Sequence, residues 1–476
     1  MIQVNCRQDV LASCLEGDRI PVARNFLLRC FAVASLFAVL LRVPAVCHSE
    51  EVSFIRDVAP VLVQQCQACH GSKEAESDYR LHTFEDLLKP GDYGEPPIVA
   101  GQPAESLLFR LISSDDDAER MPKDSTPLSV EQIEAVRQWI AQGAPFDSRS
   151  ESESLDQQMP RRDYPQPPEV YPAAVPITAM AIRPQTDHVY VGGFYELTVW
   201  NMSTGQLVSR INNVAERTYG LTFSPDGSLL AVAGGSPGTA GEARLLRAED
   251  GTEVTVLTTS SDVVFDIAFR PDGQEVAIAL ADGTIRIFEV TGGQLKLSIE
   301  NHGDWVTAIA WRGDGQRLAS ASRDKTAKFF DANSGGLLAT FSAHGQQVHD
   351  VAVSADGKQV FSSGADHRVR AWNPEDGKQI AEVARCGGEA FKLLVAGGQL
   401  FSTSADRIAR QHQVEDRKEV RQFSGHTDWP ISLAASVEAK RLCAGCFDGR
   451  IGVWSLEDGS QVSSFIAAPG LAVSDP

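Results

Sequence analysis

The chain has 476 residues, which is enough for two or three domains. Charged residues make up 22% and hydrophobic residues 43% of the sequence, the composition of an ordinary soluble globular protein. The formal net charge of −20 argues against a nucleic-acid partner, because nucleic acids are bound through basic surfaces.

The N-terminus, residues 1–48, is interpreted as a signal region. Arg24 and Arg29 precede an apolar run at 30–41, and small residues follow at 45–47, as in an export signal. The run is too short to span a bilayer, which needs about 20 residues. No later segment is long and apolar enough for a membrane span. We expect a periplasmic or otherwise exported protein, with the start codon and cleavage site left open because residues 1–23 are unusually polar.

The motif that carries chemistry is Cys66-Gln67-Ala68-Cys69-His70. C-x-x-C-H is the attachment motif of c-type haem. Its two thiols add across the vinyl groups of the haem, and the adjacent histidine becomes the proximal iron ligand. A zinc or redox C-x-x-C is the alternative, but no second Cys/His pair lies nearby. One such motif predicts one covalent haem c.

A distal ligand is needed if the iron has six ligands. The other four methionines lie before the mature chain, in a polar linker or in the strand-rich half, which leaves Met121. Pro122 follows it and restricts the loop, and a thioether ligand raises the haem potential relative to two histidines. His82 is the rival ligand, and packing of Met121 as an ordinary core residue is the other interpretation.

Two helices are predicted around this motif. Residues 53–66 carry apolar side chains at helical spacing and end at Cys66. Residues 129–142 begin with Ser129 and Gln132 in a capping box and end at Gly143. Between residues 50 and 147 there are 19 acidic and 8 basic side chains. This negative field could steer a basic redox partner protein, or it could simply keep an exported protein soluble.

Residues 53–147 resemble the planctomycete-type cytochrome c domain. The matching pieces are CQACHG, RLHTFEDLLKPGDYG, PPIVAGQPAESLLFRLI, MPK, PLS and WIAQGAPF. The resemblance implies covalent haem on Cys66 and Cys69, with His70 as proximal and Met121 as distal iron ligand. Lys123 departs from the pattern, since such domains often have proline there. A single C-x-x-C-H argues against di-haem peroxidase chemistry.

The second half of the chain is a repeat array. Four-residue turns ending in Asp-Gly recur at 224–227, 270–273, 312–315 and 354–357, each between apolar runs that predict strands. A period of about 40–45 residues with four strands per unit is the WD40 propeller pattern. Units begin near 175, 214, 258, 300, 343, 384 and 425, which predicts seven blades. We expect residues 234–241 to form an inserted surface loop and residues 461–466 to form the last outer strand.

Internal polar marks support the repeats. They have the spacing of the hydrogen-bonded tetrad of WD40 blades, which is structural: His344, Ser362, Asp366 and Trp372; His302, Ser320 and Asp324 with Phe330; and His426, Asp448 and Trp454 with Ala444 in the serine position. Cys443 and Cys446 form a second C-x-x-C, but they lie on a predicted strand, where residues three apart point to opposite faces and do not bridge.

The sequence therefore predicts a multidomain protein with a small all-α cytochrome c domain followed by an all-β seven-bladed WD40 propeller. The predicted parts are a signal region (1–48), the haem domain (49–147), a flexible linker (148–172) and the propeller (173–470). The predicted function is electron transfer by an exported mono-haem cytochrome whose propeller docks a partner protein, which favours an electron carrier over a catalyst. A haem-linked oxidoreductase and a haem-based sensor or scaffold are the alternatives.

Overall fold

The computed structural model describes residues 51–71, 75–123, 126–148, 150–158 and 163–471. The predicted signal region therefore lies outside the described residues, as do four of the nine cysteines. Within the described ranges, no helix combines the length and the apolar character that crossing a membrane requires.

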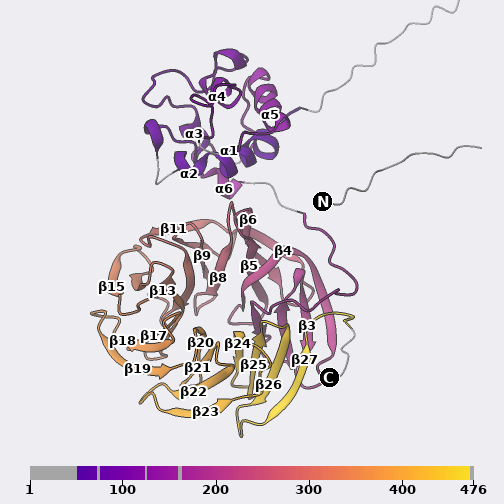
Figure 1. Cartoon of the computed structure of the whole chain (residues 1–476), viewed down its shortest axis with the longest axis vertical. Coiled ribbons are helices and arrows are strands. Elements are labelled where there is room, and N and C mark those ends of the chain that lie inside the picture. The colour runs from indigo at the N-terminus through magenta and orange to yellow at the C-terminus, as the bar shows by residue number, and fades with distance from the viewer. Residues whose placement is uncertain (1–50, 72–74, 124–125, 149, 159–162, 472–476) are drawn as a thin grey trace, which may run out of the picture. The chain divides into compact units, whose positions relative to one another are not determined.

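Residues 52–158 form a helical region (Figure 1). Its elements are a π-helix (Phe54–Val58), α1 (Ala59–Gln65), α2 (Gln67–His70), a 3-10 helix (Glu76–Asp78), α3 (Phe84–Leu87), a second 3-10 helix (Pro103–Glu105), α4 (Leu107–Ile112), α5 (Val130–Ala141) and α6 (Leu155–Gln158). The helix expected at 53–66 is present as the π-turn and α1, and Ser53 caps it by accepting a hydrogen bond from the Arg56 amide. The capping box of Ser129 and Gln132 at the start of α5 is confirmed in both directions.

Aromatic side chains hold the helical region together. Phe54 contacts Phe84 edge-on at 4.8 Å between ring centroids and Trp139 at 5.0 Å, and Phe84 contacts Phe146 at 4.6 Å. Phe54 and Trp139 are fully buried. The Trp139 indole N–H donates to the Pro145 carbonyl at 2.9 Å, so its polar atom is satisfied. This cluster joins the start of the region to its last long helix.

The predicted linker is partly packed. Leu155 is fully buried in the core of the helical region, and its amide donates to the His82 carbonyl at 2.8 Å. Farther along, the Tyr171 hydroxyl donates to Glu196 at 2.7 Å and accepts from the Phe194 amide at 2.9 Å. Composition alone suggested a tether. Leu155 and Tyr171 are among the residues that fix parts of it to the region beside it.

The remainder of the chain is mostly β, in one seven-stranded and five four-stranded antiparallel sheets. The seven-stranded sheet contains β1 (Met180–Ile182), β2 (His188–Gly192), β3 (Phe194–Asn201), β4 (Leu207–Phe223), β5 (Leu229–Ser236), β6 (Ala240–Arg247) and β7 (Glu253–Ser260). The next two sheets contain β8 (Val264–Phe269), β9 (Glu275–Leu280), β10 (Thr284–Glu289) and β11 (Leu295–Glu300), then β12 (Val306–Trp311), β13 (Arg317–Ser322), β14 (Ala327–Asp331) and β15 (Leu337–Phe341).

The last three sheets repeat the same order. They contain β16 (Val348–Val353), β17 (Val360–Gly364), β18 (Arg368–Trp372) and β19 (Gln379–Arg385); β20 (Ala390–Ala396), β21 (Gln399–Ser404), β22 (Ile408–Gln413) and β23 (Glu419–Phe423); and β24 (Pro430–Ser436), β25 (Arg441–Cys446), β26 (Arg450–Ser455) and β27 (Gln461–Ile466). The expected outer strand at 461–466 is confirmed as β27, which pairs with β26.

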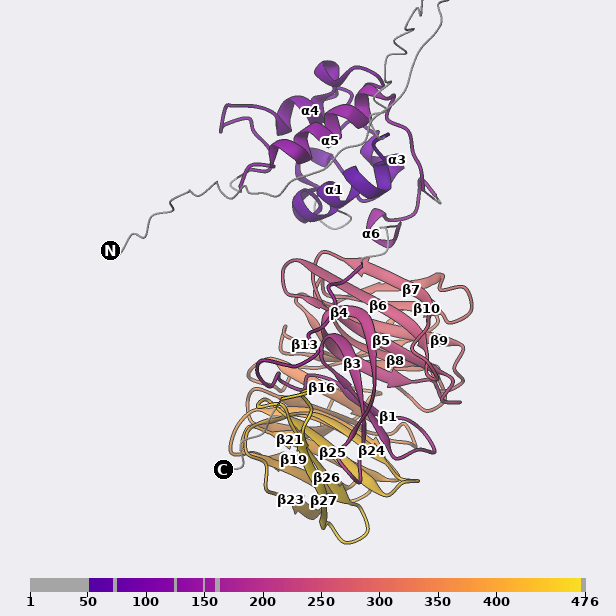
Figure 2. The same cartoon turned by 90° about the vertical axis from the view of Figure 1, so that its right-hand side faces the viewer.

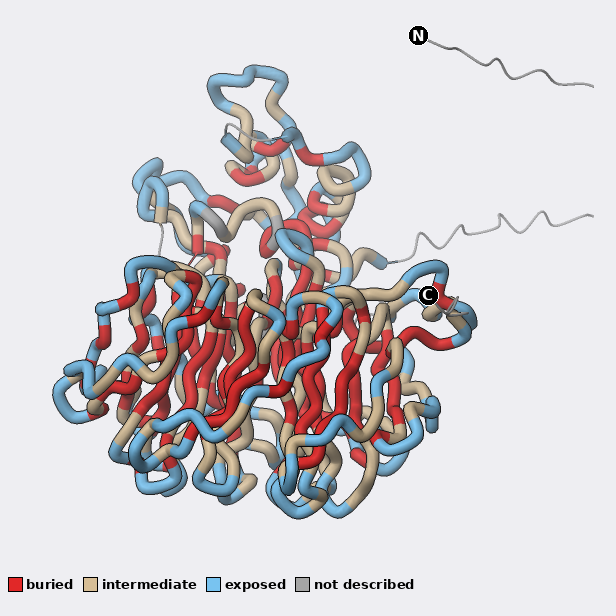
Figure 3. The backbone as a smooth tube through the Cα atoms, turned by 60° about the horizontal axis from the view of Figure 1, so that its bottom comes forward, coloured by how far each residue is buried: buried red, intermediate tan, exposed pale blue. Residues whose placement is uncertain are grey.

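The sheets form a closed ring. The first strands of neighbouring four-stranded sheets contact one another in order from β8 to β24, β4 contacts β8, and β1 contacts both β4 and β24. Figure 1 shows this ring, and Figure 2 shows β1 beside β24, where its two ends meet. Figure 3 shows that buried residues follow the strands and exposed residues follow the connecting loops. Closure leaves no inner strand without a neighbour.

The predicted Asp-Gly turns are confirmed. Gly227 adopts φ +71°, the left-handed conformation that glycine allows, and the Asp226 carboxylate accepts from the Ser228 amide at 3.1 Å. The loop expected at 234–241 is wrong in extent. Most of that segment lengthens β5 and β6, and only residues 237–239 turn, because the glycines there permit close pairing between the two strands.

Candidate haem site and polar networks of the sheets

Cys66 and Cys69 lie on one helical turn. Cys66 separates α1 from α2, its amide donates to the Leu62 carbonyl at 3.0 Å, and its own carbonyl accepts from His70 at 3.0 Å. Neither thiol forms a disulfide. Cys66 is half-buried against the core and Cys69 is exposed. Burial and the nearby Cys69 raise the pKa of the Cys66 thiol to about 12. Two free thiols therefore stand at the required spacing, one on the core and one open to solvent.

The ring of His70 is oriented by Tyr79. His70 Nδ1 lies 3.1 Å from the Tyr79 carbonyl oxygen, which can only accept, so Nδ1 carries the proton. The Tyr79 ring meets the imidazole edge-on at 5.6 Å, and its hydroxyl donates to the Leu87 carbonyl at 3.0 Å. Nε2 is left with its lone pair, and a hydrogen bond from the other ring nitrogen is how metal-ligating histidines are normally held.

The two candidate distal ligands have different surroundings. Met121 is half-buried and packs against the same core cluster as Cys66, and its amide donates to the Leu111 carbonyl at 3.1 Å. His82 Nδ1 lies 3.4 Å from a carboxylate oxygen of Asp86. The structure thus gathers Cys66, Tyr79 and Met121 on one apolar cluster, whereas the His82 ring already has a carboxylate beside it.

These residues fit a covalently attached haem. The set comprises two unbridged thiols three residues apart, the following histidine with its Nδ1 at the Tyr79 carbonyl, and a thioether on the shared apolar cluster. Thiol, imidazole and thioether are the groups that attach and ligate haem in c-type cytochromes.

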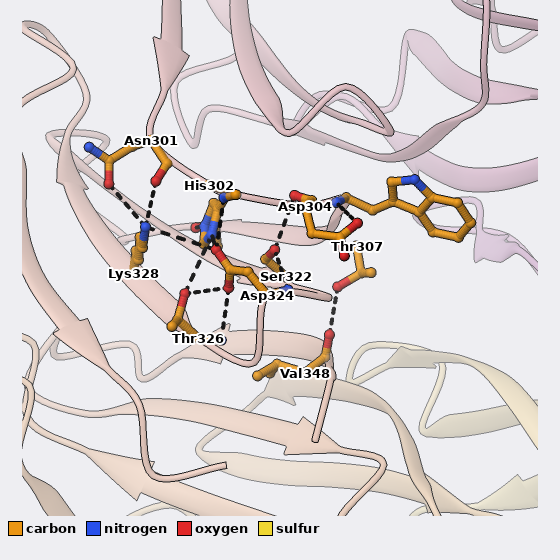
Figure 4. A network of polar contacts seen from close by, with 12 residues as sticks. Asn301, His302, Asp304, Thr307, Ser322, Asp324, Thr326, Lys328 and Val348 are labelled. Atoms are coloured by element: carbon orange, nitrogen blue, oxygen red, sulfur yellow. Dashed lines mark hydrogen bonds and ion pairs between the residues drawn. The ribbon is translucent and has the colours of Figure 1, made fainter. Parts of the chain in front are cut away.

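Two of the predicted polar networks in the sheets are confirmed in part. His344 contacts Asp366 through Nδ1 at 3.0 Å and Ser362 through Nε2 at 2.8 Å. The equivalent distances for His302 are 2.7 Å to Asp324 and 2.6 Å to Ser320, and Figure 4 shows His302 beside Asp324. These chains satisfy polar groups that the sheets bury.

The sequence predicted that Trp372 would belong to the hydrogen-bonded network of His344, but it does not. Trp372 is fully buried, but its indole nitrogen has no hydrogen-bond partner. Its ring stacks on Phe341 instead, at 5.5 Å and within 2° of parallel. Packing of the large ring against Phe341 has decided its orientation over the hydrogen bond.

The network expected at His426 is not formed. His426 Nδ1 lies 3.4 Å from Cys446 Sγ, and Nε2 has no partner. Asp448 accepts from the Thr427 hydroxyl, and burial lowers the pKa of His426 to about 4. With alanine in the serine position, the imidazole has no hydroxyl to bond. Sequence spacing identified the residues, but it could not show that Cys446 and Thr427 had taken over the contacts.

The two kinds of network predict different costs of mutation. The Asp366 carboxylate accepts hydrogen bonds from His344, from Arg370 at 2.6 Å and from the Gly345 amide. Asp366→Ala therefore leaves these partners without their acceptor. We expect it to lower the free energy of unfolding by about 3 kcal/mol. Asp448→Ala is the matched control, and we expect a loss below about 1 kcal/mol. Urea titration followed by circular dichroism measures the unfolding free energy of both variants. Equal losses would contradict the conclusion that the network is formed at His344 and not at His426.

A buried charged cluster escaped the sequence analysis. Asp350 in β16 is buried, accepts from the Leu393 amide at 2.8 Å and lies 3.6 Å from the Lys392 ammonium. Asp266 in β8 accepts from the Ile309 amide at 3.0 Å and is close enough to Lys392 to affect its pKa. Burial raises the pKa of Asp350 to about 6, and the like charge of Asp266 adds to the increase. Each carboxylate links its inner strand to the next one.

The raised pKa of Asp350 predicts a pH dependence. Its folded pKa exceeds the ordinary value, so its stabilising effect is complete below pH 4 and is lost as the pH rises through about 6. Asp350→Asn keeps a carbonyl acceptor and does not titrate. Between pH 4.5 and 7.5, we expect wild type to lose about 2–3 kcal/mol more unfolding free energy than the variant. Urea titrations test this, with exposed Glu415→Gln as control; parallel pH profiles would refute it.

Comparison with known proteins identifies the two regions. Residues 66–125 match the family "Planctomycete cytochrome C", and residues 251–289, 293–331, 335–373 and 417–455 match the WD40 family, "WD domain, G-beta repeat". The chain thus joins a cytochrome c-type region to WD40 repeats. The resemblance drawn from the sequence is confirmed in both halves.

Several known proteins resemble a part of this chain. Periodic tryptophan protein 2 homolog of Neurospora crassa is 28% identical over 28% of this chain and 15% of its own length. WD repeat-containing protein VIP3 of Arabidopsis thaliana is 28% identical over 22% and 36%, and the uncharacterized WD repeat-containing protein sll1491 of Synechocystis is 32% identical over 25% and 33%. The matches thus span about a third or less of these relatives.

A solved structure shares the fold. The crystal structure of the computationally designed Ika8 protein matches with a TM-score of 0.50 and 23% identity, covering 62% of this chain and 88% of that one. A likeness at this identity concerns the fold alone.

Proposed function

We propose that this protein is an exported mono-haem c-type cytochrome that transfers electrons and docks its partner through a WD40 propeller. The observation that carries the proposal is the turn from Cys66 to His70, where both thiols are free and the imidazole is fixed by the Tyr79 carbonyl. The match of residues 66–125 to a cytochrome family supports it.

In this proposal the chain's own residues divide the work. Cys66 and Cys69 attach the haem, His70 supplies Nε2 as proximal ligand, and Met121 supplies the distal thioether. A bound haem c supplies a one-electron iron centre whose potential depends on its axial ligands. The Tyr79 carbonyl makes the His70 imidazole a stronger donor, because it accepts the Nδ1 proton. Cys66 and Met121 both pack against the core cluster that contains Phe54, Phe84 and Trp139.

Charge supports a basic redox partner. Residues 50–147 carry 19 acidic and 8 basic side chains. Several described acids stand exposed, among them Asp115, Asp116 and Asp117. Long-range attraction between such a surface and a basic protein raises the rate of encounter and falls with added salt. The location of the protein outside the cytoplasm is part of this proposal and rests on the signal-like segment.

The ring of sheets is proposed to be a seven-bladed propeller. β4 is 17 residues long; its first half pairs with β3 and its second half pairs with β5. The seven-stranded sheet is therefore two four-stranded blades that share one continuous strand. Together with the five other sheets this gives seven blades, which agrees with the seven units in the sequence. Repeats of this kind support a docking role, since rigid scaffolds present variable loops.

Absorption spectroscopy tests the haem assignment. The full chain is matured in a periplasm that contains haem-attachment machinery, as wild type, Met121→Ala and the double variant Cys66→Ala/Cys69→Ala. We expect a haemochrome spectrum of one c haem in wild type and complete loss of bound haem in the double variant. In Met121→Ala we expect the far-red band of the thioether–ferric pair to vanish while the haem stays attached.

The other outcomes distinguish the alternatives. An unchanged far-red spectrum in Met121→Ala would move the distal ligand to His82, which His82→Ala would then confirm. An open distal site that binds carbon monoxide reversibly in wild type would contradict electron transfer and favour a sensor. A second chromophore in the purified protein would favour an oxidoreductase.

A further inference from the structure

Aromatic side chains line the ends of the inner strands. Tyr219 contacts Phe265 at 5.8 Å, and Phe265 contacts Trp305 at 5.1 Å. Farther around the ring, Phe391 contacts Trp429 at 6.2 Å and Trp429 contacts Phe447 at 6.3 Å. Each of these six aromatic residues lies near the start of an inner strand, in the loop before that strand, or at the end of the neighbouring hairpin. Since every sheet runs from inner to outer strand in the same order, these ends share one face of the ring.

Two of the loops on this face are built alike. One reads His302-Gly303-Asp304-Trp305 before β12, and the other reads His426-Thr427-Asp428-Trp429 before β24. In both, the aspartate accepts a hydrogen bond from the tryptophan amide at 2.8 Å. In both, the tryptophan carbonyl accepts from the first residue after the neighbouring strand, Arg323 at 3.0 Å or Phe447 at 2.9 Å.

The loop before β12 holds a cation of its own. The Arg323 guanidinium lies 4.4 Å from the centre of the Trp305 ring, and its Nε lies 3.7 Å from the Asp304 carboxylate. Aromatic faces attract cations, most strongly when the ring is an indole. The chain therefore demonstrates that a guanidinium fits between this tryptophan and this aspartate.

The loop before β24 has the same receptor without the cation. Phe447 occupies the position of Arg323, and Trp429 and Phe447 are 46% and 51% exposed. Among the described residues, Asp428 forms no ion pair, and no Lys or Arg lies over the Trp429 ring. The exposed indole and phenyl rings thus lie next to the half-buried Asp428.

We propose that Trp429, Phe447 and Asp428 form a docking site for an arginine side chain of a partner protein. Charge favours such a partner. Six segments at this end of the inner strands β4 to β24 (213–219, 260–266, 301–307, 342–350, 386–392 and 424–431) carry seven acidic and two basic side chains. Without Asp266, Asp350 and Lys392, which form the buried cluster, five acidic side chains and one basic side chain remain. The partner's guanidinium stacks on Trp429 and pairs with Asp428, in the way that Arg323 contacts Trp305 and Asp304 within the chain. The site deepens the proposed docking role of the propeller and rests on it.

Fluorine NMR of the full chain labelled with 5-fluorotryptophan tests the site. The chain has seven tryptophans, and Trp429→Phe assigns the resonance. Nα-acetyl-arginine amide should shift this resonance saturably, and the neutral isostere Nα-acetyl-citrulline amide should not. Asp428→Asn should weaken arginine binding about twofold to fivefold. Leu338→Ala, at an equally exposed apolar residue on an outer strand, should leave binding unchanged.

Two exchanges make the test sharper. Phe447→Arg copies Arg323 and should abolish binding, because the new guanidinium fills the site from within. Arg323→Ala should create a second binding site, seen as a new response of the Trp305 resonance. Binding that survives in Phe447→Arg, or equal shifts with arginine and citrulline, would overturn the proposal.

A final experiment tests whether the bound arginine belongs to a protein chain or is a free amino acid. The acetylated and amidated tripeptide Leu-Arg-Leu should bind about threefold or more tightly than the single amino acid, since flanking apolar side chains can contact Phe447. Equal affinities would contradict a protein partner. Haem attachment is read from absorbance in the same samples, so failure of the docking site and failure of the cytochrome assignment are distinguishable.

Discussion

The hydrogen bond between His70 and the Tyr79 carbonyl is the contact on which the candidate haem site depends. It fixes both the proton on Nδ1 and the direction of the ring, and it ties the turn at Cys66 to the segment before α3. Tyr79 is in turn fixed by its bond to Leu87 and by the core. The aromatic cluster of Phe54, Phe84 and Trp139 joins the π-helix, α3 and α5 of the same region.

The sheets bury polar side chains, and these side chains need hydrogen-bond partners within the ring of strands. Two histidines join a carboxylate to a serine across a sheet, and buried aspartates link one inner strand to the next. Repetition lets a contact be lost in one place while others keep the ring closed. The relaxed network at His426 lies in the loop that also carries the exposed Trp429, and the exposed Phe447 follows the neighbouring strand β25.

Much of the architecture could be predicted from the sequence because the signals were local. Capping residues marked α5, Asp-Gly turns marked the hairpins, and the C-x-x-C-H motif marked the haem site. What could not be predicted depends on contacts between distant residues. The bond to the Tyr79 carbonyl, the stacking of Trp372 on Phe341 and the bond from Cys446 to His426 have no sequence pattern. The buried Asp350 and Lys392 likewise come together only when β16 and β20 become neighbours.

Mass spectrometry of the tryptic peptide that spans residues 57–73 tests the central claim most directly. Protein matured with haem-attachment machinery should yield this peptide carrying the mass of one haem, with fragmentation assigning both thioether bonds to Cys66 and Cys69. A peptide with two unmodified thiols, from protein that is otherwise folded and matured in the same way, would contradict the account and leave the C-x-x-C-H turn without its cofactor.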